Sequence, residues 1–292
     1  MKFANLDTDE DQFFIEQSIC IIGLGLMGGS LALALRGYCA RLIGVDTVPS
    51  TLALARQKNV VDLATDDLTE ALAQADLVIL AAPVRANLAL LEKIPLIHPD
   101  PISIIDLSST KSMIVASMNQ LPHGFEALGG HPMCGKEKSG LSHADGKLFW
   151  DATFALTETE HTTPELRNLA EQMIRIISAK ALWIDAPTHD RWAAATSHLP
   201  YLVSSALAAS TPSEAAPLIG PGFQSTGRLA GSDITMMVDI LTTNHQQVLD
   251  ALARYRITLE EIERTLRNAS DELPGLLEKA NKNYKKLIDR QR

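Results

Sequence analysis

The sequence has few cysteines, and they are scattered. Only three occur among the 292 residues, at Cys20, Cys39 and Cys134. Their spacing fits no zinc-binding pattern, so no metal site is predicted from them. Cys20 lies in an apolar run, and we expect it to be a small buried side chain rather than a reactive one.

The sequence also lacks long apolar runs and an excess of positive charge. No apolar run approaches the ~18 residues of a membrane span. Lys and Arg total 26 against 35 Asp and Glu, a net charge of −9, which argues against nucleic acid or an anionic membrane as the main partner. Residues 7–11 include four acidic side chains, unlike a signal or transit peptide, so a cytoplasmic location is expected.

The overall composition is that of a packed globular protein. Hydrophobic residues make up 46% of the chain and charged residues 21%, and 292 residues are enough for two domains of ordinary size. Because the net charge is negative, an anionic substrate would need a local Arg or Lys in its binding site.

A glycine motif near the N-terminus indicates a dinucleotide site. Gly23, Gly25 and Gly28 form the pattern G-x-G-x-x-G between an apolar run at 19–22 and a helical pattern at 30–36. Gly23 permits a tight turn, Gly25 lets a pyrophosphate approach the backbone, and Gly28 lets helix and strand pack closely. The helix N-terminus then offers N–H groups to the phosphates.

An acidic residue follows at the expected distance. A second strand, predicted over 41–45, ends in Asp46, which lies 18 residues after Gly28 and suits the ribose hydroxyls. Asp46 would repel a 2′-phosphate, and residues 47–49 supply no arginine to bind one, so NAD is the predicted cofactor. The predicted cofactor-binding residues are Gly23, Gly25, Leu26, Met27, Gly28, Asp46 and Pro83. The alternative is an ordinary strand-to-helix turn in which Asp46 caps the next helix.

The remaining N-terminal pattern alternates strands with helices. Further strands are predicted at 60–63, 76–82, 102–106, 125–128, 153–156 and 181–185. This alternation predicts an α/β fold of Rossmann type with a parallel sheet and right-handed crossovers. Asp46, Pro83, Asp106 and Gly130 would then lie at the C-terminal edge, where open sheets bind ligands. Residues 129–132 are expected to form a loop at a strand end.

The pattern becomes entirely helical after Asp185. Residues 189–209 read as a long helical stretch containing Pro200, and a wide apolar stripe recurs from Ile234 onwards. We therefore predict a dinucleotide-binding domain at 1–185, with an extension at 1–17, and an all-α domain at 186–292. The apolar stripe favours a homodimer through the helical domain, and the alternative is a monomer with a closed bundle.

Four motifs resemble those of the prephenate/arogenate dehydrogenase family. They are Asp106-Leu-Ser-Ser-Thr-Lys111, the run 129–140 that begins Gly-Gly-His-Pro-Met, the run 189–200 that ends Ser-His-Leu-Pro, and the run 220–230 that contains Arg228. The resemblance covers roughly residues 18–270. It implies oxidation of a cyclohexadienol with loss of CO₂, a step of tyrosine biosynthesis.

The resemblance assigns the catalytic chemistry to two residues. A neutral imidazole can accept the hydroxyl proton while hydride leaves the ring carbon, and His131 matches the family histidine. Ser109 matches the family serine that contacts this histidine and the substrate hydroxyl. The alternatives are a structural histidine in a loop and, for Ser109, an N-cap of the helix predicted at 111–118.

The resemblance also suggests substrate-binding residues. Arg228 matches an arginine that binds a substrate carboxylate, with a surface arginine as the alternative. Glu137 matches an acid that lines or gates the pocket, and it could equally be an exposed loop charge. His198 is either a ligand contact or a structural hydrogen-bonding group.

Two departures from the family pattern affect the choice of substrate. Tyr201 stands where family members have His, and Gln224 stands where they have a basic residue. Both are expected near the substrate. Prephenate, with its ketoacid side chain, is the favoured substrate, and arogenate, with its amino acid side chain, or dual specificity is the alternative.

The sequence is also compatible in part with two other functions. A 3-hydroxyacid dehydrogenase or an imine reductase would share the glycine motif and the helical domain. Those enzymes usually place a catalytic Lys in the helical half, and residues 186–270 contain no lysine. A non-catalytic dinucleotide sensor would have no use for His131, Ser109 and Arg228 together.

Overall fold

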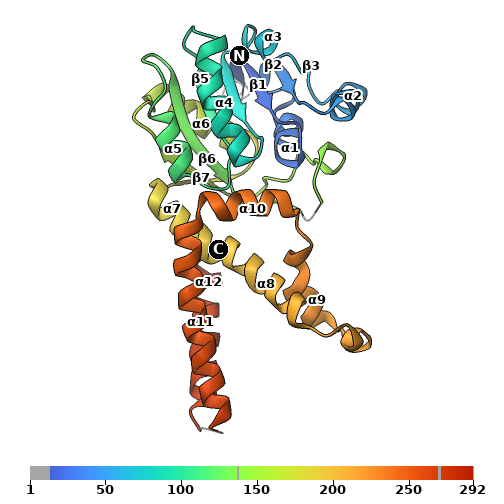
Figure 1. The fold of residues 1–292 in the computed structure, drawn as a ribbon. Coiled ribbons are helices and arrows are strands. Elements are labelled where there is room, and N and C mark those ends of the chain that lie inside the picture. Colours follow the sequence, from blue (N-terminus) through green and yellow to red (C-terminus); the bar gives the residue numbers. More distant parts are fainter. Residues whose placement is uncertain (1–13, 137, 269–270, 292) are drawn as a thin grey trace, which may run out of the picture. The chain divides into compact units, whose positions relative to one another are not determined.

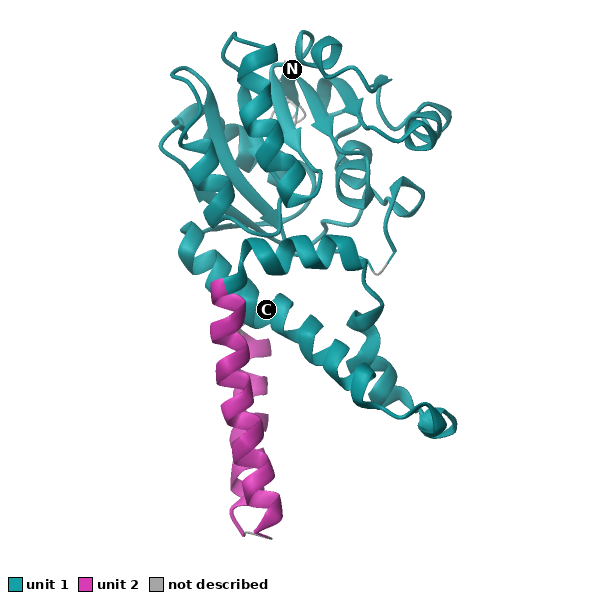
Figure 2. Cartoon of the chain, in the orientation of Figure 1, with its two compact units in different colours: residues 1–245 teal, residues 246–292 magenta. Residues whose placement is uncertain are grey.

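The structure is a computed structural model that describes residues 14–136, 138–268 and 271–291 (Figure 1). Contacts divide the chain into two compact units, residues 1–245 and residues 246–292 (Figure 2). The domain boundary predicted after residue 185 stays a prediction. Among the described residues, no helix has both the length and the apolar character that a bilayer span requires.

The described part of the first unit is built around one sheet of eight strands in the order β3-β2-β1-β4-β5-β6-β7-β8. The strands are β1 (Ile15–Ile22), β2 (Cys39–Val45), β3 (Leu63–Thr65), β4 (Leu77–Leu80), β5 (Ser103–Asp106), β6 (Glu126–Pro132), β7 (Thr153–Glu158) and β8 (Lys180–Trp183). Strand β1 lies between β2 and β4, so the chain reverses its direction of winding there. This is the position at which doubly wound sheets bind nucleotides.

Helices connect and follow the strands (Figure 1). In the first unit they are α1 (Leu26–Leu35), α2 (Pro49–Gln57), α3 (Leu68–Leu72), α4 (Val84–Ile97), α5 (Ser112–Met118), α6 (Pro164–Ile176), α7 (Ala186–Ala193), α8 (Leu199–Ser210), α9 (Pro221–Gly227) and α10 (Ile234–Thr243). Short 3₁₀ segments lie at Leu141–His143 (η2), Ser213–Leu218 (η4) and Arg228–Gly231 (η5).

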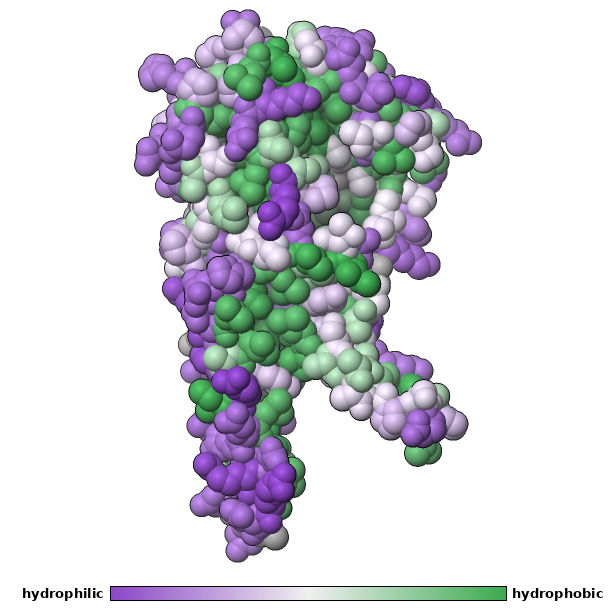
Figure 3. All heavy atoms as spheres, in the orientation of Figure 1, coloured by the Kyte–Doolittle hydropathy of each residue, from purple (hydrophilic) through white to green (hydrophobic). Residues whose placement is uncertain are grey.

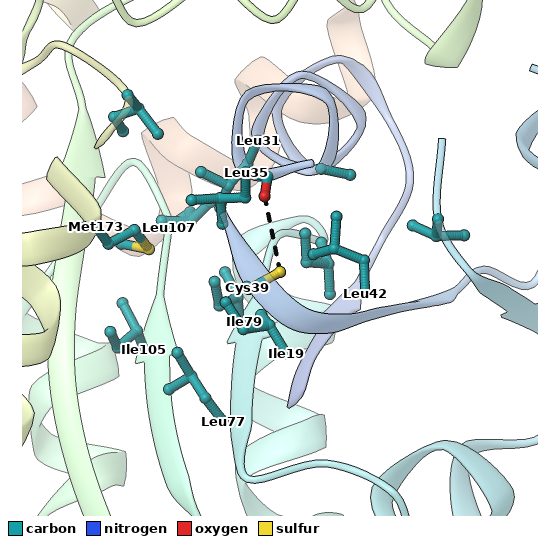
Figure 4. Packing of buried hydrophobic residues seen from close by; sticks show 14 of the residues in the cluster. Ile19, Leu31, Leu35, Cys39, Leu42, Leu77, Ile79, Ile105, Leu107 and Met173 are labelled. Carbon is teal, nitrogen blue, oxygen red and sulfur yellow. Dashed lines mark hydrogen bonds between the residues drawn. The ribbon is translucent and has the colours of Figure 1, made fainter. Parts of the chain in front are cut away.

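The core follows from the alternation of side chains along each strand. Ile19 and Ile21 of β1 belong to one apolar cluster, which also contains residues of α1 and α6, whereas Cys20 and Ile22 belong to a second, which contains residues of α4 and α5. Figure 4 shows part of the first cluster, which includes Ile19 of β1, Leu31 and Leu35 of α1 and Met173 of α6. Both faces of the sheet are therefore buried, as expected for a parallel sheet with crossover helices.

The expectation for Cys20 is confirmed. Its side chain is fully buried, and burial raises the pKa of the thiol to about 12. A thiol held neutral in this way is a packing group rather than a nucleophile.

The sheet differs from the all-parallel prediction in one strand pair. Strands β1 to β6 pair in parallel, but β7 pairs with β6 in the antiparallel sense, and β8 then pairs with β7 in parallel through α6. A parallel pair needs a crossover that returns the chain to the starting edge. The segment between β6 and β7 contains only the short η2 helix among its described residues, so the chain reverses instead.

Three predicted boundaries differ from the structure. Strand β1 begins at Ile15, within the extension predicted at 1–17, and residues 1–13 of that extension lie outside the described residues. The strand expected at 60–63 begins only at Leu63, after a turn. Residues 129–132, expected to be a loop, belong to β6, because His131 and Pro132 pair with Ala155 and Phe154 of β7. The antiparallel partner extends β6 beyond the end that the sequence pattern suggested.

The long helical stretch predicted at 189–209 is interrupted. Helix α7 ends at Ala193, a π-helical turn (η3) covers Ala194–His198, and α8 begins at Leu199. Pro200 lies in the first turn of α8, where a missing N–H costs nothing. Isolated π turns are frequent at functional sites.

The second unit consists of α11, whose bounds are His245–Arg267, and α12 (Leu273–Gln291). Helix α11 repeats apolar residues at helical spacing, but several are exposed: Leu249, Leu252, Ile257, Leu259 and Leu266. In the first unit, Leu218, Ile219, Ile234, Met236 and Val238 are also exposed. Figure 3 shows apolar atoms gathered over α8 and α10.

Candidate active site

The glycine turn after β1 packs closely against the residues that follow β4 and against itself. Gly23 has φ +98°, and a Cβ there would lie 2.8 Å from the Ala81 backbone. A Cβ on Gly28 would lie 1.9 Å from the Gly23 oxygen. Gly25 differs, since a Cβ there would meet nothing within 4 Å. The first and third glycines therefore serve packing, and the second leaves open space over the backbone at the start of α1.

Asp46 lies at the end of β2 and fixes the glycine turn. Its Oδ2 accepts a hydrogen bond from Leu24 N at 2.9 Å, and its Oδ1 accepts one from Val48 N at 2.9 Å. Helix α2 has no side-chain cap, so the alternative in which Asp46 caps that helix is wrong. Each carboxylate oxygen can accept further bonds. The side chain is half-buried and can still accept from ribose hydroxyls.

The other predicted cofactor residues lie at the same edge of the sheet. Leu26 and Met27 are half-buried in the first turn of α1, and Pro83 is exposed directly before α4. The space over Gly25, the N–H groups of the first turn of α1 and the Asp46 carboxylate are the set of groups that a dinucleotide requires. The residues present therefore fit NAD.

His131 lies near the end of β6 and is buried, with 8% of its surface exposed. Its Nδ1 is 2.8 Å from Nε2 of His189, and Nδ1 of His189 is 2.9 Å from Oδ1 of Asp190. The two imidazole rings meet edge to face at 63°. Three titratable side chains from β6 and α7 thus form one continuous hydrogen-bonded chain.

Asp190 is held by two backbone N–H groups at the start of α5, one just before the helix and one on its first residue. Its Oδ1 accepts from Lys111 N at 2.7 Å, and its Oδ2 accepts from Ser112 N at 2.8 Å. Although burial raises its pKa, the hydrogen bonds from His189, Ser112 and Lys111 outweigh this and lower it overall. Asp190 is therefore an ionised carboxylate at neutral pH.

His131 is electrically neutral at the same pH. Burial lowers its pKa well below the usual value, and His189, Lys111 and His198 lower it further. A neutral imidazole has one nitrogen that can accept a proton. Since Nδ1 is engaged by His189, Nε2 is the nitrogen left for chemistry.

A buried ion pair lies beside this chain. The Lys111 ammonium contacts the Asp106 carboxylate, and both side chains are fully buried. Asp106 also accepts from Ser108 N and from the Asn87 amide, which in turn contacts the Ser108 hydroxyl. Removing one partner of such a pair typically costs about 3–5 kcal/mol. The pair holds rigid the segment that presents Ser109 and the N–H groups of α5.

Ser109 lies in this segment and is half-buried. It does not cap the helix as the alternative suggested, because the N-cap position is Lys111 and Asp190 binds the N–H groups there. Within the described residues, no hydrogen bond joins the Ser109 hydroxyl to His131. As far as the described residues go, the Ser109 hydroxyl is therefore free to bind a ligand.

His198 ends the π turn and is buried. Its Nδ1 is 3.3 Å from the Asn244 amide, which also donates to the Asp190 carbonyl at 2.8 Å. Burial lowers its pKa to about 4. Its Nε2 is buried and has no hydrogen-bond partner among the described residues. A buried polar atom without a partner is costly, so this atom is a candidate ligand contact.

Arg228 and Gln224 lie on neighbouring turns, in η5 and α9, and both are exposed. Segment η5 packs on α8, where the Ser204 hydroxyl accepts from Ala230 N at 2.9 Å. Tyr201, three residues before Ser204, is half-buried on α8. These three predicted residues lie on η5, α9 and α8, whereas His131 lies on β6. Glu137 lies outside the described residues.

The sequence did not identify His189 and Asp190 as parts of the site. They stand at the start of the helical stretch predicted at 189–209. Sequence spacing did not connect them to the site, because His131 and His189 lie 58 residues apart and Asp190 and Lys111 lie 79 apart. The available signal was the adjacent pair of ionisable residues, His189 and Asp190, at the start of the helical half.

Two family models match the chain. One, described as "Prephenate dehydrogenase, nucleotide-binding domain", matches residues 31–182. The other, described as "Prephenate dehydrogenase, dimerization domain", matches residues 185–280. Together they span well over half of the chain, and the order of the two agrees with the α/β and all-α parts of the structure.

Individual relatives agree with these matches. The prephenate dehydrogenase of Lactococcus lactis subsp. cremoris is 34% identical over 257 residues, which are 84% of this chain and 70% of that protein. The crystal structure of prephenate dehydrogenase from Aquifex aeolicus with hydroxyphenyl propionate and NAD+ has a TM-score of 0.85 at 26% identity, and the match covers 93% of this chain and 98% of that one. Synechocystis arogenate dehydrogenase has a TM-score of 0.77 at 32% identity, over 92% of this chain and 99% of that one. The chain belongs to the prephenate dehydrogenase family, as its motifs indicated.

Proposed function

We propose that this chain is an NAD-dependent oxidoreductase that converts prephenate to 4-hydroxyphenylpyruvate and CO₂ in tyrosine biosynthesis. The observation that carries the proposal is the neutral His131, whose Nδ1 is engaged by His189 and whose Nε2 remains for a substrate hydroxyl. Membership of the family and the open space over Gly25 support the reaction type and the cofactor.

In this proposal, His131 accepts the proton of the ring hydroxyl at Nε2. Loss of that proton raises the electron density on the carbon that bears the oxygen, which favours departure of hydride. The glycine turn and Asp46 would hold NAD+, which would supply the hydride acceptor when bound. The Ser109 hydroxyl hydrogen-bonds the substrate oxygen and orients it toward the imidazole. The ring carboxylate then leaves as CO₂, its bonding electron pair aromatises the ring to a phenolate, and protonated His131 returns its proton to that oxygen to give the phenol.

Substrate carboxylates require cationic or neutral donors in an acidic protein. Arg228 is proposed to bind one carboxylate through its guanidinium. The buried His198 Nε2 and the half-buried Tyr201 hydroxyl are further proposed contacts, and Glu137 is proposed to line the entrance. His198 has a strongly lowered pKa, so it would act as a neutral donor or acceptor.

Arogenate is a second candidate substrate, and Gln224 is the observation that favours it. A neutral side chain in place of a basic one weakens attraction for a second anionic group and tolerates an ammonium group. Losing one charged contact typically costs about 1.5–3 kcal/mol, or roughly 10–150-fold in affinity. The arogenate dehydrogenase of Synechocystis is among the structural relatives.

A direct assay separates these possibilities. The purified chain is given NAD+ with prephenate, arogenate or a 3-hydroxyacid, and NADH formation is followed. We expect turnover of prephenate with kcat/KM above that for arogenate. A tenfold preference for arogenate would reassign the substrate, and turnover of the 3-hydroxyacid alone would reject the proposed reaction.

We further propose that the helical part forms a homodimer. The family model that matches residues 185–280 is described as a dimerization domain. Exposed apolar side chains lie on α10 and on α11, which a solitary chain would leave in water. Light scattering of the purified protein should give twice the chain mass of 31.7 kDa. A mass of one chain would reject it. The cytoplasmic location stays a prediction.

A further inference from the structure

The hydrogen-bonded chain from Asp190 through His189 to His131 has an orientation that can be worked out from one end. Because the Asp190 carboxylate already binds two backbone N–H groups and is ionised, it can only accept hydrogen bonds. The nitrogen that faces it, Nδ1 of His189 at 2.9 Å, must therefore carry a proton.

The direction of the hydrogen bonds can be followed from His189 to His131. When His189 is neutral, its proton on Nδ1 leaves a lone pair on Nε2. The His189 Nε2 atom then accepts across the 2.8 Å contact, so the proton of this contact belongs to Nδ1 of His131. This leaves Nε2 of His131 unprotonated. The nitrogen available to a substrate is then a base, not a donor.

We propose that His189 and Asp190 are positioning residues, which hold His131 in the tautomer that can accept a proton at Nε2 and stabilise the positive charge that it then acquires. The inference deepens the proposed function and rests on it for its kinetic consequences. The tautomer itself follows from the hydrogen bonds of the protein alone and can be measured without a substrate.

Several ionisable groups around His131 affect the charge on its ring. Lys111, before α5, disfavours a positive imidazole, and so do His189 and His198. The Lys111 charge is opposed by Asp106, its ion-pair partner. Among the described residues, Asp190 is the carboxylate that contacts His189 and can oppose a cation on the two imidazoles. When His131 gains a proton at Nε2, its Nδ1 proton can shift to His189 Nε2, which places the charge on the ring that contacts Asp190.

Folding also depends on Asp190, so its loss alone would not separate positioning from structure. The more informative position is His189, where two substitutions of different chemistry can be compared. His189→Gln places an amide oxygen near the position of Nε2 and keeps an acceptor for His131 Nδ1. His189→Leu fills similar space without an acceptor. A merely structural role in a buried site would favour Leu at least as much as Gln.

The kinetic test compares kcat, KM and the NAD+ dissociation constant in these two variants. We expect His189→Leu to lower kcat by roughly 10²–10³-fold, within the range for losing a correctly placed base. His189→Gln should recover at least tenfold over His189→Leu, with KM and NAD+ affinity within threefold of wild type in both. His161→Leu is the control, since it removes a half-buried histidine bound to the Phe125 carbonyl. A Gln variant no better than Leu would overturn the proposal.

Asp190→Asn tests the charge. Without the carboxylate, a protonated His131 is less stable, so the acid limb of the kcat–pH profile should move to lower pH while kcat at its plateau falls about 10-fold or more. A structural role would lower kcat or stability without moving the limb. An unmoved limb, or one that moves to higher pH, would overturn the proposed charge stabilisation.

Nitrogen NMR of the histidine-labelled full-length protein measures the tautomer directly. The His131 signals are assigned by their loss in His131→Asn. We expect Nδ1 of His131 to be protonated and Nε2 to be bare in the wild type at neutral pH. The reverse pattern, or a doubly protonated ring, would overturn the inference even if the enzyme turns over prephenate. The expected tautomer with no turnover of either substrate would instead reject the proposed function.

Discussion

Two alanine substitutions in the glycine turn should affect different properties, one the stability of the protein and the other the binding of NAD, because the two positions have different surroundings. At Gly28 a Cβ would lie 1.9 Å from the Gly23 oxygen, which is backbone and cannot move aside cheaply. At Gly25 a Cβ would meet nothing within 4 Å. Gly28→Ala should therefore damage the protein itself, and Gly25→Ala should damage only the binding of NAD.

The magnitudes follow from packing energies. Alanine in a helix is normally favoured over glycine by about 0.5–1 kcal/mol, yet overpacking costs about 1–3 kcal/mol, so Gly28→Ala should lower the free energy of unfolding by up to about 2 kcal/mol. Gly25→Ala should leave stability within about 0.5 kcal/mol. If the pyrophosphate occupies the space over Gly25, the methyl group should weaken the free energy of NAD+ binding by the same 1–3 kcal/mol, which raises Kd roughly 5–150-fold.

Thermal denaturation and calorimetric titration with NAD+ measure the two effects separately. The expected result is a lowered Tm for Gly28→Ala, and an unchanged Tm with a weakened Kd for Gly25→Ala. Wild-type affinity in Gly25→Ala would refute the placement of the pyrophosphate. An unchanged Tm in Gly28→Ala would show that the turn shifts to accept a methyl group.

Four further predictions concern single groups. Asp46→Asn should shift the kcat/KM ratio toward NADP+, since the carboxylate that repels a 2′-phosphate is removed; comparable ratios in wild type and variant would contradict this. His131→Asn should lower kcat by roughly 10²–10⁴-fold with little change in NAD+ affinity, and near-normal turnover would place the base elsewhere. Gln224→Lys should shift the kcat/KM ratio toward prephenate over arogenate, and an unchanged ratio would mean that residue 224 does not face the substrate side chain. The pKa of His198 is about 4 in the folded protein, below its unfolded value, so the free energy of unfolding should fall by about 2 kcal/mol as the pH drops from above ~6.5 to 5. The fall in Tm between pH 7.5 and 5 should therefore be smaller in His198→Asn, and an equal fall would contradict the buried neutral ring.

The local parts of the fold could be predicted from sequence because their signals are local. The glycine spacing, the apolar strand at 19–22 and the acid at the end of β2 all fall within about 30 residues of each other. Each feature needs a particular type of residue at its position, and that residue can be read directly from the sequence. The α/β and all-α halves also follow from periodicity. The strand direction of β7 could not be predicted, since it depends on the absence of a crossover helix rather than on any residue of β7.

The site was only half predictable for a similar reason. His131 was identified by its motif, but its partner His189 comes from a different part of the chain, and the group that binds the α5 N–H groups is Asp190 rather than the nearby Ser109. Hydrogen bonds between distant residues leave no spacing in the sequence. The π turn that carries His198 was likewise hidden within a continuous helical pattern.

The most direct test of the account follows NADH and CO₂ together while the purified chain acts on prephenate, with His131→Asn as the matched variant. The account predicts equal amounts of NADH and CO₂ from the wild type, with 4-hydroxyphenylpyruvate as the organic product. It predicts a rate at least 10²-fold lower from the variant, which still binds NAD+. A wild-type protein that is folded and binds NAD+ but forms neither product from prephenate or arogenate would contradict the central claim.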